Sequence, residues 1–273
     1  MQRIAIFGYG NMGAAFARAV RERFPECRLM AAEVDPDRAD AATREVNAVP
    51  LVLGDLSKLE ALEAVADFNP EILLLAVKPL QFESLAAALR PHVSDALIIS
   101  LMAGVDLAGL SASMQTTRVV RFLPNLAAAY GKSVTAVAPH PQLSAADTDH
   151  ATAVAEAAGM AVQLPEPLIS SLIGISGSGI AFAFQFLHAL ALGGTQAGIS
   201  YPQSLEIALA TVEGAAAAVR ESGIHPADYV TRVCSPGGTT INGIAALEQH
   251  GFTAAVMQAV RSAEQRSREL ERG

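Results

Sequence analysis

The sequence predicts a doubly wound α/β domain with a mostly parallel sheet, followed by an all-α C-terminal half. Short apolar runs alternate with helical stretches through the first part of the chain. This order is typical of a parallel sheet that carries helices on both faces. A Pro-Glu-Pro segment at residues 165–167 then interrupts the chain, and beyond it only helical patterns follow. We therefore expect two domains, residues 1–165 and 166–273.

The strands expected in the first domain are short apolar runs that end at polar or glycine residues. The run Ile-Leu-Leu-Leu-Ala-Val at 72–77 is apolar throughout, as a strand buried on both faces should be. Helices are expected at 12–24, at 37–47 and from Ser57, a suitable N-cap, to about residue 66. The full set of expected strands is 3–7, 28–33, 50–53, 72–77, 96–101, 118–123 and 134–137.

The second domain reads as a set of alanine-rich helices. Its most apolar stretch, 180–192, contains Gln185 and His188 and is shorter than the ~20 residues that a membrane span needs. We interpret it as a buried helix, with His188 as a hydrogen-bonded core residue, and expect no membrane partner. Apolar helix faces that one chain leaves uncovered would be buried by a second copy, which predicts a homodimer. The expected helices are 168–193, 202–222, 227–233, 240–250 and 252–272.

Composition excludes several classes of protein. The 273 residues are 51% hydrophobic and carry a formal net charge of −8, which offers no basic surface for nucleic acid. Two isolated cysteines, Cys27 and Cys234, form neither a disulfide framework nor a metal site. The N-terminus leads directly into a strand pattern without the features of a signal peptide. These observations predict a cytoplasmic protein without a bound metal.

A glycine motif follows the first expected strand. The segment Gly8-Tyr9-Gly10-Asn11-Met12-Gly13 fits G-x-G-x-x-G, and it lies between a strand and a helix. The first glycine of such a motif permits a tight turn, the second lets a pyrophosphate approach the backbone, and the third allows close packing of helix and strand. The N-terminus of the helix supplies amide donors and partial positive charge. The motif predicts a Rossmann domain that binds a nicotinamide dinucleotide.

Further residues are expected to contact that cofactor. Glu33 or Asp35 could accept from a ribose 2′-hydroxyl, which favours NADH, whereas Arg38 could pair with a 2′-phosphate, which favours NADPH. The sequence leaves this choice open. Ala76-Val77-Lys78 ends a central strand at the edge where ligands bind in such sheets. Lys78 could therefore meet a cofactor phosphate or ribose, or be a solvated surface lysine.

Two glycine- and serine-rich segments precede helices in the second domain. In Ser176-Gly177-Ser178-Gly179, small residues either expose helix amides to an anion or allow tight packing. The hydroxyls and free amides of Ser235-Pro236-Gly237-Gly238-Thr239-Thr240 form a candidate nest for a carboxylate. Capping of the following helix by Thr239 or Thr240 is the structural alternative.

With these motifs the chain resembles the pyrroline-5-carboxylate reductase family over nearly its whole length. The most specific segment is SPGGTT at 235–240, followed by Leu247-Glu248 and Gly251-Phe252. The other segments are FGYGNM at 7–12, LAVKP at 75–79, RFLPN at 121–125, ISGSG at 175–179 and TVEGA at 211–215. The chain departs from the family pattern in two places: Leu126-Ala127 replaces Thr-Pro, and Ile180 replaces a proline.

The resemblance implies NADPH- or NADH-dependent reduction of 1-pyrroline-5-carboxylate to L-proline. It also implies a C-terminal dimerisation domain and dimers that assemble into a larger ring. Pro124 and Asn125 would join the cofactor site with Asn11 and Met12. Ser176, Ser178 and the nest Ser235, Gly237, Gly238 and Thr239 would bind the substrate. Thr240 would hydrogen-bond the ring nitrogen as the catalytic residue, and hydride transfer to the iminium carbon would depend on orientation and electrostatics.

Three alternatives differ in chemistry. A β-hydroxyacid dehydrogenase needs a lysine in its helical domain as a proton shuttle, and residues 165–273 contain no lysine. A dinucleotide-binding regulatory protein without turnover would not need the complete SPGGTT segment. A related reductase could act on a six-membered cyclic imino acid, because one methylene is worth only ~1–3 kcal/mol of discrimination. The sequence leaves the ring size open.

Overall fold

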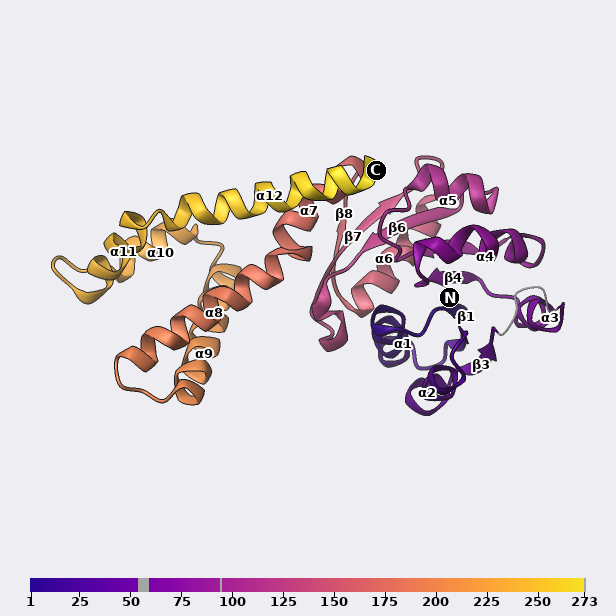
Figure 1. Ribbon diagram of the computed structural model, residues 1–273, viewed down its shortest axis with the longest axis horizontal. Coiled ribbons are helices and arrows are strands. Elements are labelled where there is room, and N and C mark those ends of the chain that lie inside the picture. The colour runs from indigo at the N-terminus through magenta and orange to yellow at the C-terminus, as the bar shows by residue number, and fades with distance from the viewer. Residues whose placement is uncertain (54–58, 94, 273) are drawn as a thin grey trace. The chain divides into compact units, whose positions relative to one another are not determined.

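The computed structural model describes residues 1–53, 59–93 and 95–272, and the chain forms two compact units (Figure 1). The first unit consists of Met1–Gly177 together with Glu264–Gly273, and the second is Ser178–Ala263. The first unit is an α/β domain and the second is helical. The predicted fold class is therefore confirmed. The expected N-cap Ser57 lies outside the described residues.

A sheet forms the centre of the first unit, and its described part has eight strands in the order β3-β2-β1-β4-β5-β6-β7-β8. Pairing is parallel from β3 through to β6, antiparallel between β6 and β7, and parallel between β7 and β8. The strands are β1 (Arg3–Phe7), β2 (Arg28–Glu33), β3 (Val49–Val52), β4 (Ile72–Leu75), β5 (Leu97–Ser100), β6 (Val119–Leu123), β7 (Ser133–Pro139) and β8 (Gly159–Gln163). The connections after β1 and after β4 leave in opposite directions, so a topological switch point lies between these two strands.

Alternating strand residues feed two separate hydrophobic cores. In β1, Ile4 and Ile6 face one core, and Ala5 and Phe7 face the other. The helices on the first face are α1 (Asn11–Arg23), α2 (Pro36–Val46) and α6 (Ala145–Ala157). Those on the second face are α3 (Leu59–Phe68), α4 (Phe82–Leu89) and α5 (Leu107–Met114). The result is the three-layer arrangement that the alternation of strands and helices predicts.

The strand β8 was not expected from the sequence. Its residues Gly159–Gln163 form an edge strand in which no described side chain is fully buried, so the apolar run that marks a central strand is missing. Strand β4 is shorter than expected because Ala76 and Val77 leave the sheet and turn toward the ligand edge. The other expected strands are present: those at 3–7 and 28–33 have the expected ends, and the rest differ by at most two residues at an end.

The first unit extends past the expected boundary near residue 165. Glu166 accepts hydrogen bonds from the backbone of Leu107 (2.8 Å) and from Arg121 (3.2 Å), and Ile169 is fully buried. The last turns of the chain return to this segment, where Glu264 accepts from Ser171 at 2.8 Å. The elements here are η4 (Glu166–Leu168), α7 (Ile169–Leu172) and the π-turn η5 (Ile173–Gly177).

The second unit consists of helices that lie exposed in the single chain. They are α8 (Gly179–Gln196), α9 (Tyr201–Ser222), α10 (Pro226–Val233), α11 (Thr239–Gln249) and most of α12 (Phe252–Arg272). The interpretation of 180–192 as a buried helix is wrong for one chain, because Ala191 is the buried residue that α8 contributes. His188 is exposed as well, although its Nδ1 lies 2.9 Å from the hydroxyl of Tyr201.

The apolar run around α8 is also longer than the sequence pattern suggested. Residues Glu166–Gln196 are long and apolar enough to cross a membrane by length and composition, which is weak evidence for a span. The π-turn Ile173–Gly177 interrupts the run, and Ile169 and Leu172 at its start belong to the core of the first unit. The exposed apolar side chains of α8 are therefore expected to be buried against another protein surface.

Candidate active site

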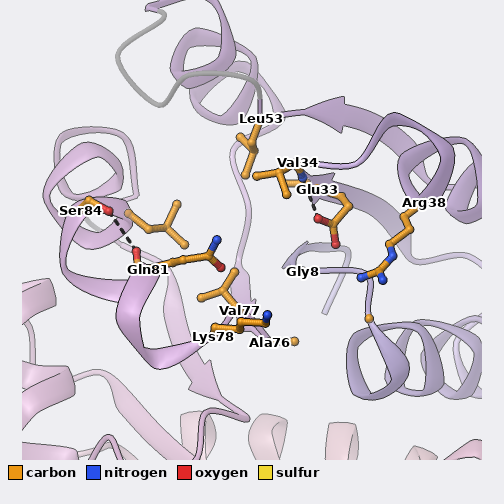
Figure 2. Close-up of a pocket in the computed structure, with 13 residues that line it drawn as sticks. Gly8, Glu33, Val34, Arg38, Leu53, Ala76, Val77, Lys78, Gln81 and Ser84 are labelled. Carbon is orange, nitrogen blue, oxygen red and sulfur yellow. Dashed lines mark hydrogen bonds between the residues drawn. The ribbon is translucent and has the colours of Figure 1, made fainter.

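A pocket opens at the switch point between β1 and β4 (Figure 2). The two strand ends are held together because the backbone amide of Ala76 donates to the carbonyl of Phe7 at 2.7 Å. The pocket lining includes seven of the residues expected to bind the cofactor: Gly8, Gly10, Glu33, Arg38, Ala76, Val77 and Lys78. The structure thus brings together residues from three separate parts of the sequence.

The glycines of the motif have distinct structural requirements. Gly8 has a φ of +93°, and a Cβ there would lie 2.6 Å from the carbonyl oxygen of Ala76. A Cβ on Gly13 would collide with the carbonyl oxygen of Gly8, so this glycine permits the helix to approach the strand. A Cβ on Gly10 would meet only the guanidinium of Arg38, at 3.9 Å. Gly10 therefore leaves space in the pocket, whereas Gly8 and Gly13 are required by the fold.

The N-terminus of α1 faces this turn with its amides available. Gly10 is the N-cap residue and, among the described residues, no side chain caps the helix there. The first turn also lacks an acidic residue. Uncapped amides at a helix N-terminus, beside a glycine without a side chain, suit the pyrophosphate of a dinucleotide. Asn11 and Met12 begin the helix, outside the described pocket lining.

Glu33 ends β2 with a buried carboxylate that is 8% exposed. Its Oε2 accepts the backbone amide of Tyr9 at 2.7 Å, and its Oε1 accepts that of Val34 at 2.7 Å. The amide of Asp35 lies 3.4 Å from the same Oε1. Backbone donors from two segments therefore fix this carboxylate beside the glycine turn, where Figure 2 shows it directed into the pocket.

The remaining charged residues differ in their roles. Asp35 accepts from the amide of Asp37 as the N-cap of α2 and lies 3.6 Å from Nε of Arg38, outside the pocket lining. Arg38 extends over the pocket on the side of Glu33, and Lys78 lies on the opposite side (Figure 2). Of the predicted cofactor residues, Asp35 therefore contacts Arg38 and does not line the pocket, and its role toward the cofactor remains a prediction.

Sequence reasoning missed six residues of the lining. They flank the ends of β2, β3 and β4 or begin the next helix, and they are Ala32, Val34, Leu53, Gln81, Ser84 and Leu85. Most are apolar or small, so no charge or motif marks them in the sequence. Ala32, Val34 and Leu53 lie at or within one residue of expected strand ends, which was the available signal, since ligands bind at the carboxyl edge of such sheets. The other three lie farther along the chain, beyond the strand expected at 72–77, and had no such signal.

Tyr9 anchors the glycine turn on the side away from the pocket, since it is buried and does not line the pocket. Its ring is buried, and its hydroxyl donates to Glu45 of α2 at 3.2 Å. Arg18 of α1 donates to the same carboxylate at 2.8 Å. Burial raises the pKa of Tyr9 to about 12, and the charge of Glu45 adds to this effect. The turn is thus tied to α1 and α2 by side chains that do not line the pocket.

Pro124 and Asn125 lie outside the described pocket lining, at the end of β6. The Asn125 side chain is buried, where its Nδ2 donates to Oγ of Ser176 at 2.9 Å and its Oδ1 accepts from Ala127 as the N-cap of η3 (Leu126–Tyr130). Its backbone amide donates to Ser133 at 3.2 Å. Asn125 and Ser176 are therefore joined, and their predicted contacts with ligands remain predictions.

The segment Ser235–Thr240 forms a turn in front of α11 in the second unit. Gly237 has a φ of +69°, and the amide of Gly238 donates to the carbonyl of Ser235 at 3.0 Å. The hydroxyl of Ser235 contacts the position that a Cβ on Gly238 would take. Gly238 is the N-cap residue, and the part of the chain that the structure describes provides no side-chain cap there. The structure thus does not show the capping role considered for Thr239 and Thr240.

The other expected substrate residues lie where the first unit ends. Ser176 belongs to the first unit, whereas Ser178 precedes α8 in the second and accepts the amide of Ala181 through its carbonyl at 2.9 Å. Within residues 1–53, 59–93 and 95–272, no group of three His, Cys, Asp or Glu side chains is placed to hold a metal ion. The functional groups that the predicted site residues offer are therefore hydroxyls, amides and a few charged side chains.

Family models match both parts of the chain. Residues 166–270 match the model for pyrroline-5-carboxylate reductase dimerisation. Residues 3–104 match the model for NADP oxidoreductase, coenzyme F420-dependent. The first confirms the expected dimerisation domain and the second the expected oxidoreductase domain. A dimerisation domain also accounts for the apolar side chains that α8 exposes.

Relatives with known names agree with these matches. The chain is 36% identical to a pyrroline-5-carboxylate reductase of Methanosarcina acetivorans, over 98% of both chains. It is 40% identical to that of Synechocystis, over 73% of this chain and 75% of the relative. A crystal structure of pyrroline carboxylate reductase from Plasmodium falciparum with NADP bound has the same fold, with a TM-score of 0.82 at 22% identity over 99% of this chain and 98% of the other.

The glycine pocket, the SPGGTT turn and the full-length similarity lead to one conclusion. The alignment with the Methanosarcina relative covers 98% of this chain and therefore spans both units. The chain belongs to the pyrroline-5-carboxylate reductase family.

Proposed function

We propose that this chain reduces 1-pyrroline-5-carboxylate to L-proline with NADPH or NADH as the reductant. The observation that carries the proposal is the uncapped N-terminus of α11, which follows the SPGGTT turn. Helix amides without a side-chain acceptor suit a carboxylate. The first turn of α11 has no acidic residue that would oppose an anion. Ser235, Gly237, Gly238 and Thr239 would hold the substrate carboxylate at this turn.

Thr240 is the proposed catalytic residue. It occupies the second position of α11, its side chain is exposed in the single chain, and the N-cap role belongs to Gly238. Its hydroxyl is therefore available to a ligand. A threonine hydroxyl can accept from an iminium N–H and donate to the product amine, so it can follow the ring nitrogen through its change of charge.

The chemistry needs little acid-base machinery from the chain. The substrate would enter as the iminium, so the proton on nitrogen is already present and stays there in proline. The reduced nicotinamide, when bound, supplies the hydride for the carbon of the C=N bond. The enzyme's residues orient the substrate and stabilise its charge. The absence of lysine from residues 165–273 fits this role and disfavours alcohol oxidation.

The dinucleotide would occupy the pocket of the first unit. Gly8, Gly10 and the amides at Asn11, Met12 and Gly13 would hold the pyrophosphate, and Glu33, Arg38 and Lys78 would contact ribose or phosphate. Ala76 and Val77 form the floor at the switch point. Pro124 and Asn125 would join the cofactor site, and Ser176 and Ser178 would bind the substrate.

Assembly completes the proposal. The dimerisation domain and the exposed apolar helices support a homodimer, and we propose that dimers assemble further into a ring. We propose a cytoplasmic location, where free cysteines such as Cys27 and Cys234 are usual. We propose that residues 166–273 are the substrate and dimerisation domain, because the matched dimerisation region begins at residue 166, although the first compact unit extends to Gly177.

The test is an assay of the purified protein that follows nicotinamide absorbance. It compares 1-pyrroline-5-carboxylate with the six-membered cyclic imino acid, each with NADH and NADPH. Turnover should be highest with the five-membered ring. A higher kcat/KM with the six-membered ring would identify that imino acid, and not 1-pyrroline-5-carboxylate, as the substrate. Binding of either dinucleotide without turnover of either imine would favour a regulatory protein.

A further inference from the structure

We propose that Glu33 makes this enzyme prefer NADH over NADPH. This inference rests on the dinucleotide-binding function proposed above and adds the preferred cofactor. In this fold an acidic side chain at the end of the second strand accepts from a ribose 2′-hydroxyl, whereas a nearby arginine accommodates a 2′-phosphate. The chain has both Glu33 and Arg38 in one pocket, so their geometry decides between the two cofactors.

The carboxylate of Glu33 is held in place before any ligand arrives. The amides of Tyr9 and Val34 donate to its two oxygens at 2.7 Å each, and its side chain is nearly buried. Rotation away from the pocket would leave those amides without this acceptor. A negative charge therefore stays at the ribose end of the pocket.

The hydrogen bonds of Glu33 leave room for a hydroxyl donor. A carboxylate oxygen can accept two hydrogen bonds, and Oε2 accepts one, from Tyr9. A ribose 2′-hydroxyl could donate to the remaining lone pair. A 2′-phosphate carries a charge of about −1.5 to −2 at neutral pH, by analogy with other phosphate monoesters, and would instead meet a fixed like charge.

Arg38, the basic lining residue on the side of Glu33, also faces Asp35 and the glycine turn. Its Nε lies 3.6 Å from Asp35, whose other oxygen caps α2. Its Nη1 lies 3.9 Å from the position of a Cβ on Gly10, on the glycine turn. Arg38 is thus directed toward the expected pyrophosphate while Asp35 offsets part of its charge.

The second cation of the pocket does not compensate for Glu33. Of the described lining residues, Arg38 and Lys78 are the basic ones, and Lys78 lies across the pocket from Glu33 (Figure 2). On this side of the pocket the carboxylate of Glu33, and outside the lining that of Asp35, therefore lie near one guanidinium, that of Arg38. This local balance favours the cofactor without the extra phosphate.

The test measures binding by titration calorimetry with two probes that lack nicotinamide, ADP-ribose and 2′-phospho-ADP-ribose. The wild-type protein should bind ADP-ribose at least ~10-fold more tightly, as expected for a hydrogen bond to a charged acceptor. Because the opposing effect is electrostatic, the ratio of the two Kd values should narrow as ionic strength rises.

Three variants separate the contributions. Glu33→Gln removes the charge at similar size and should reduce the Kd ratio to within about threefold of unity. Asp35→Asn keeps an oxygen for the cap of α2 but releases Arg38, and should improve binding of 2′-phospho-ADP-ribose by about threefold. Glu45→Gln is the matched control, because Glu45 also holds Tyr9 but lies outside the pocket lining. It should leave the ratio unchanged.

The possible outcomes are distinct. Tighter binding of 2′-phospho-ADP-ribose by the wild-type protein would overturn the inference while leaving the dinucleotide site intact. An unchanged ratio of the two Kd values in both Glu33→Gln and Asp35→Asn would also overturn the inference. Failure of both probes to bind a folded protein would overturn the site itself, and the inference with it.

Discussion

The side-chain amide of Asn125 donates to the hydroxyl of Ser176 at 2.9 Å, and both groups are buried. This bond joins the end of β6 to the π-turn that closes the first unit. Two motifs that are 51 residues apart in the chain are thereby held in one place. The bond ties residues expected near the nicotinamide to residues expected near the substrate.

The first prediction concerns this bond. Asn125→Ala should destabilise the protein more than Ser176→Ala, because it also removes the acceptor for Ala127. The coupling free energy in a double-mutant cycle should be about 0.5–1.5 kcal/mol, the net value of one neutral hydrogen bond. Urea unfolding of the two single variants and the double variant measures it. Strict additivity would show that the two side chains do not interact in solution.

The second prediction concerns Thr240. Thr240→Ala should reduce kcat/KM by about 10- to 100-fold, since a hydrogen bond to a charged group is worth roughly 1.5–3 kcal/mol. Dinucleotide affinity should barely change, and Thr240→Ser should recover most of the loss. Steady-state kinetics and melting temperature are measured on the same preparations.

Thr253→Ala is the matched control for that experiment. Thr253 occupies the second position of α12, as Thr240 does in α11, and it is exposed, with its hydroxyl donating to Glu248 at 2.8 Å. It should retain full turnover. Full activity of Thr240→Ala with a lowered melting temperature would assign Thr240 a structural role only.

The third prediction separates two glycines of one motif. Gly10→Val adds a side chain that extends into the pocket, where the nearest neighbour is Arg38, so it should abolish tight dinucleotide binding with little loss of stability. Gly13→Ala collides with the carbonyl of Gly8 and should lower the melting temperature. Calorimetric binding and thermal unfolding measure the two effects. Tight binding by a folded Gly10→Val protein would contradict the assignment of this motif.

The fourth prediction concerns assembly. Phe184 and Ile207 are 52% and 51% exposed in the single chain and belong to the matched dimerisation region. Introducing a charge with Phe184→Glu or Ile207→Glu should therefore weaken self-association. Sedimentation velocity at micromolar concentration should show a dimer or larger species for the wild type. Met160→Glu is the control, since Met160 is 60% exposed on β8 of the first unit. A stable wild-type monomer would contradict the proposal.

The fifth prediction concerns pH. Arg118 donates two hydrogen bonds to Asp147, at 2.7 and 3.1 Å, and they hold the pKa of that carboxyl below its ordinary value. The pair therefore stabilises the fold above the ordinary pKa of about 3.9, and this contribution is lost as pH falls through the lower folded-state value. Asp147→Asn should cost about 0.5–1 kcal/mol at neutral pH, the range for a partly exposed pair. Denaturant unfolding at pH 7 and pH 3 should show the difference shrinking in acid.

The central sheet could be predicted because buried parallel strands leave continuous apolar runs, as residues 72–77 do. The edge strand β8 could not, since its side chains are partly exposed. The glycine motif predicted the pocket, yet the choice between Glu33 and Arg38 needed the directions of their side chains. The contact of Asn125 with Ser176 depends on how β6 meets the π-turn, which no local pattern encodes. The roles of Thr240 and of the SPGGTT turn remain predictions, supported by the absence of a side-chain cap.

The last residues of the chain belong to the first unit, although the second unit lies between them in sequence. Glu264 accepts a hydrogen bond from Ser171, and Ser267 donates one to Ser170. The first 177 residues cannot form these two bonds by themselves. Domains usually fold in order during synthesis, beginning at the N-terminus. Here the α/β domain can reach its complete set of contacts only after residues 264–272 have been synthesised. A ribosome-bound chain stalled before residue 264 should therefore present an unfinished domain to chaperones and proteases.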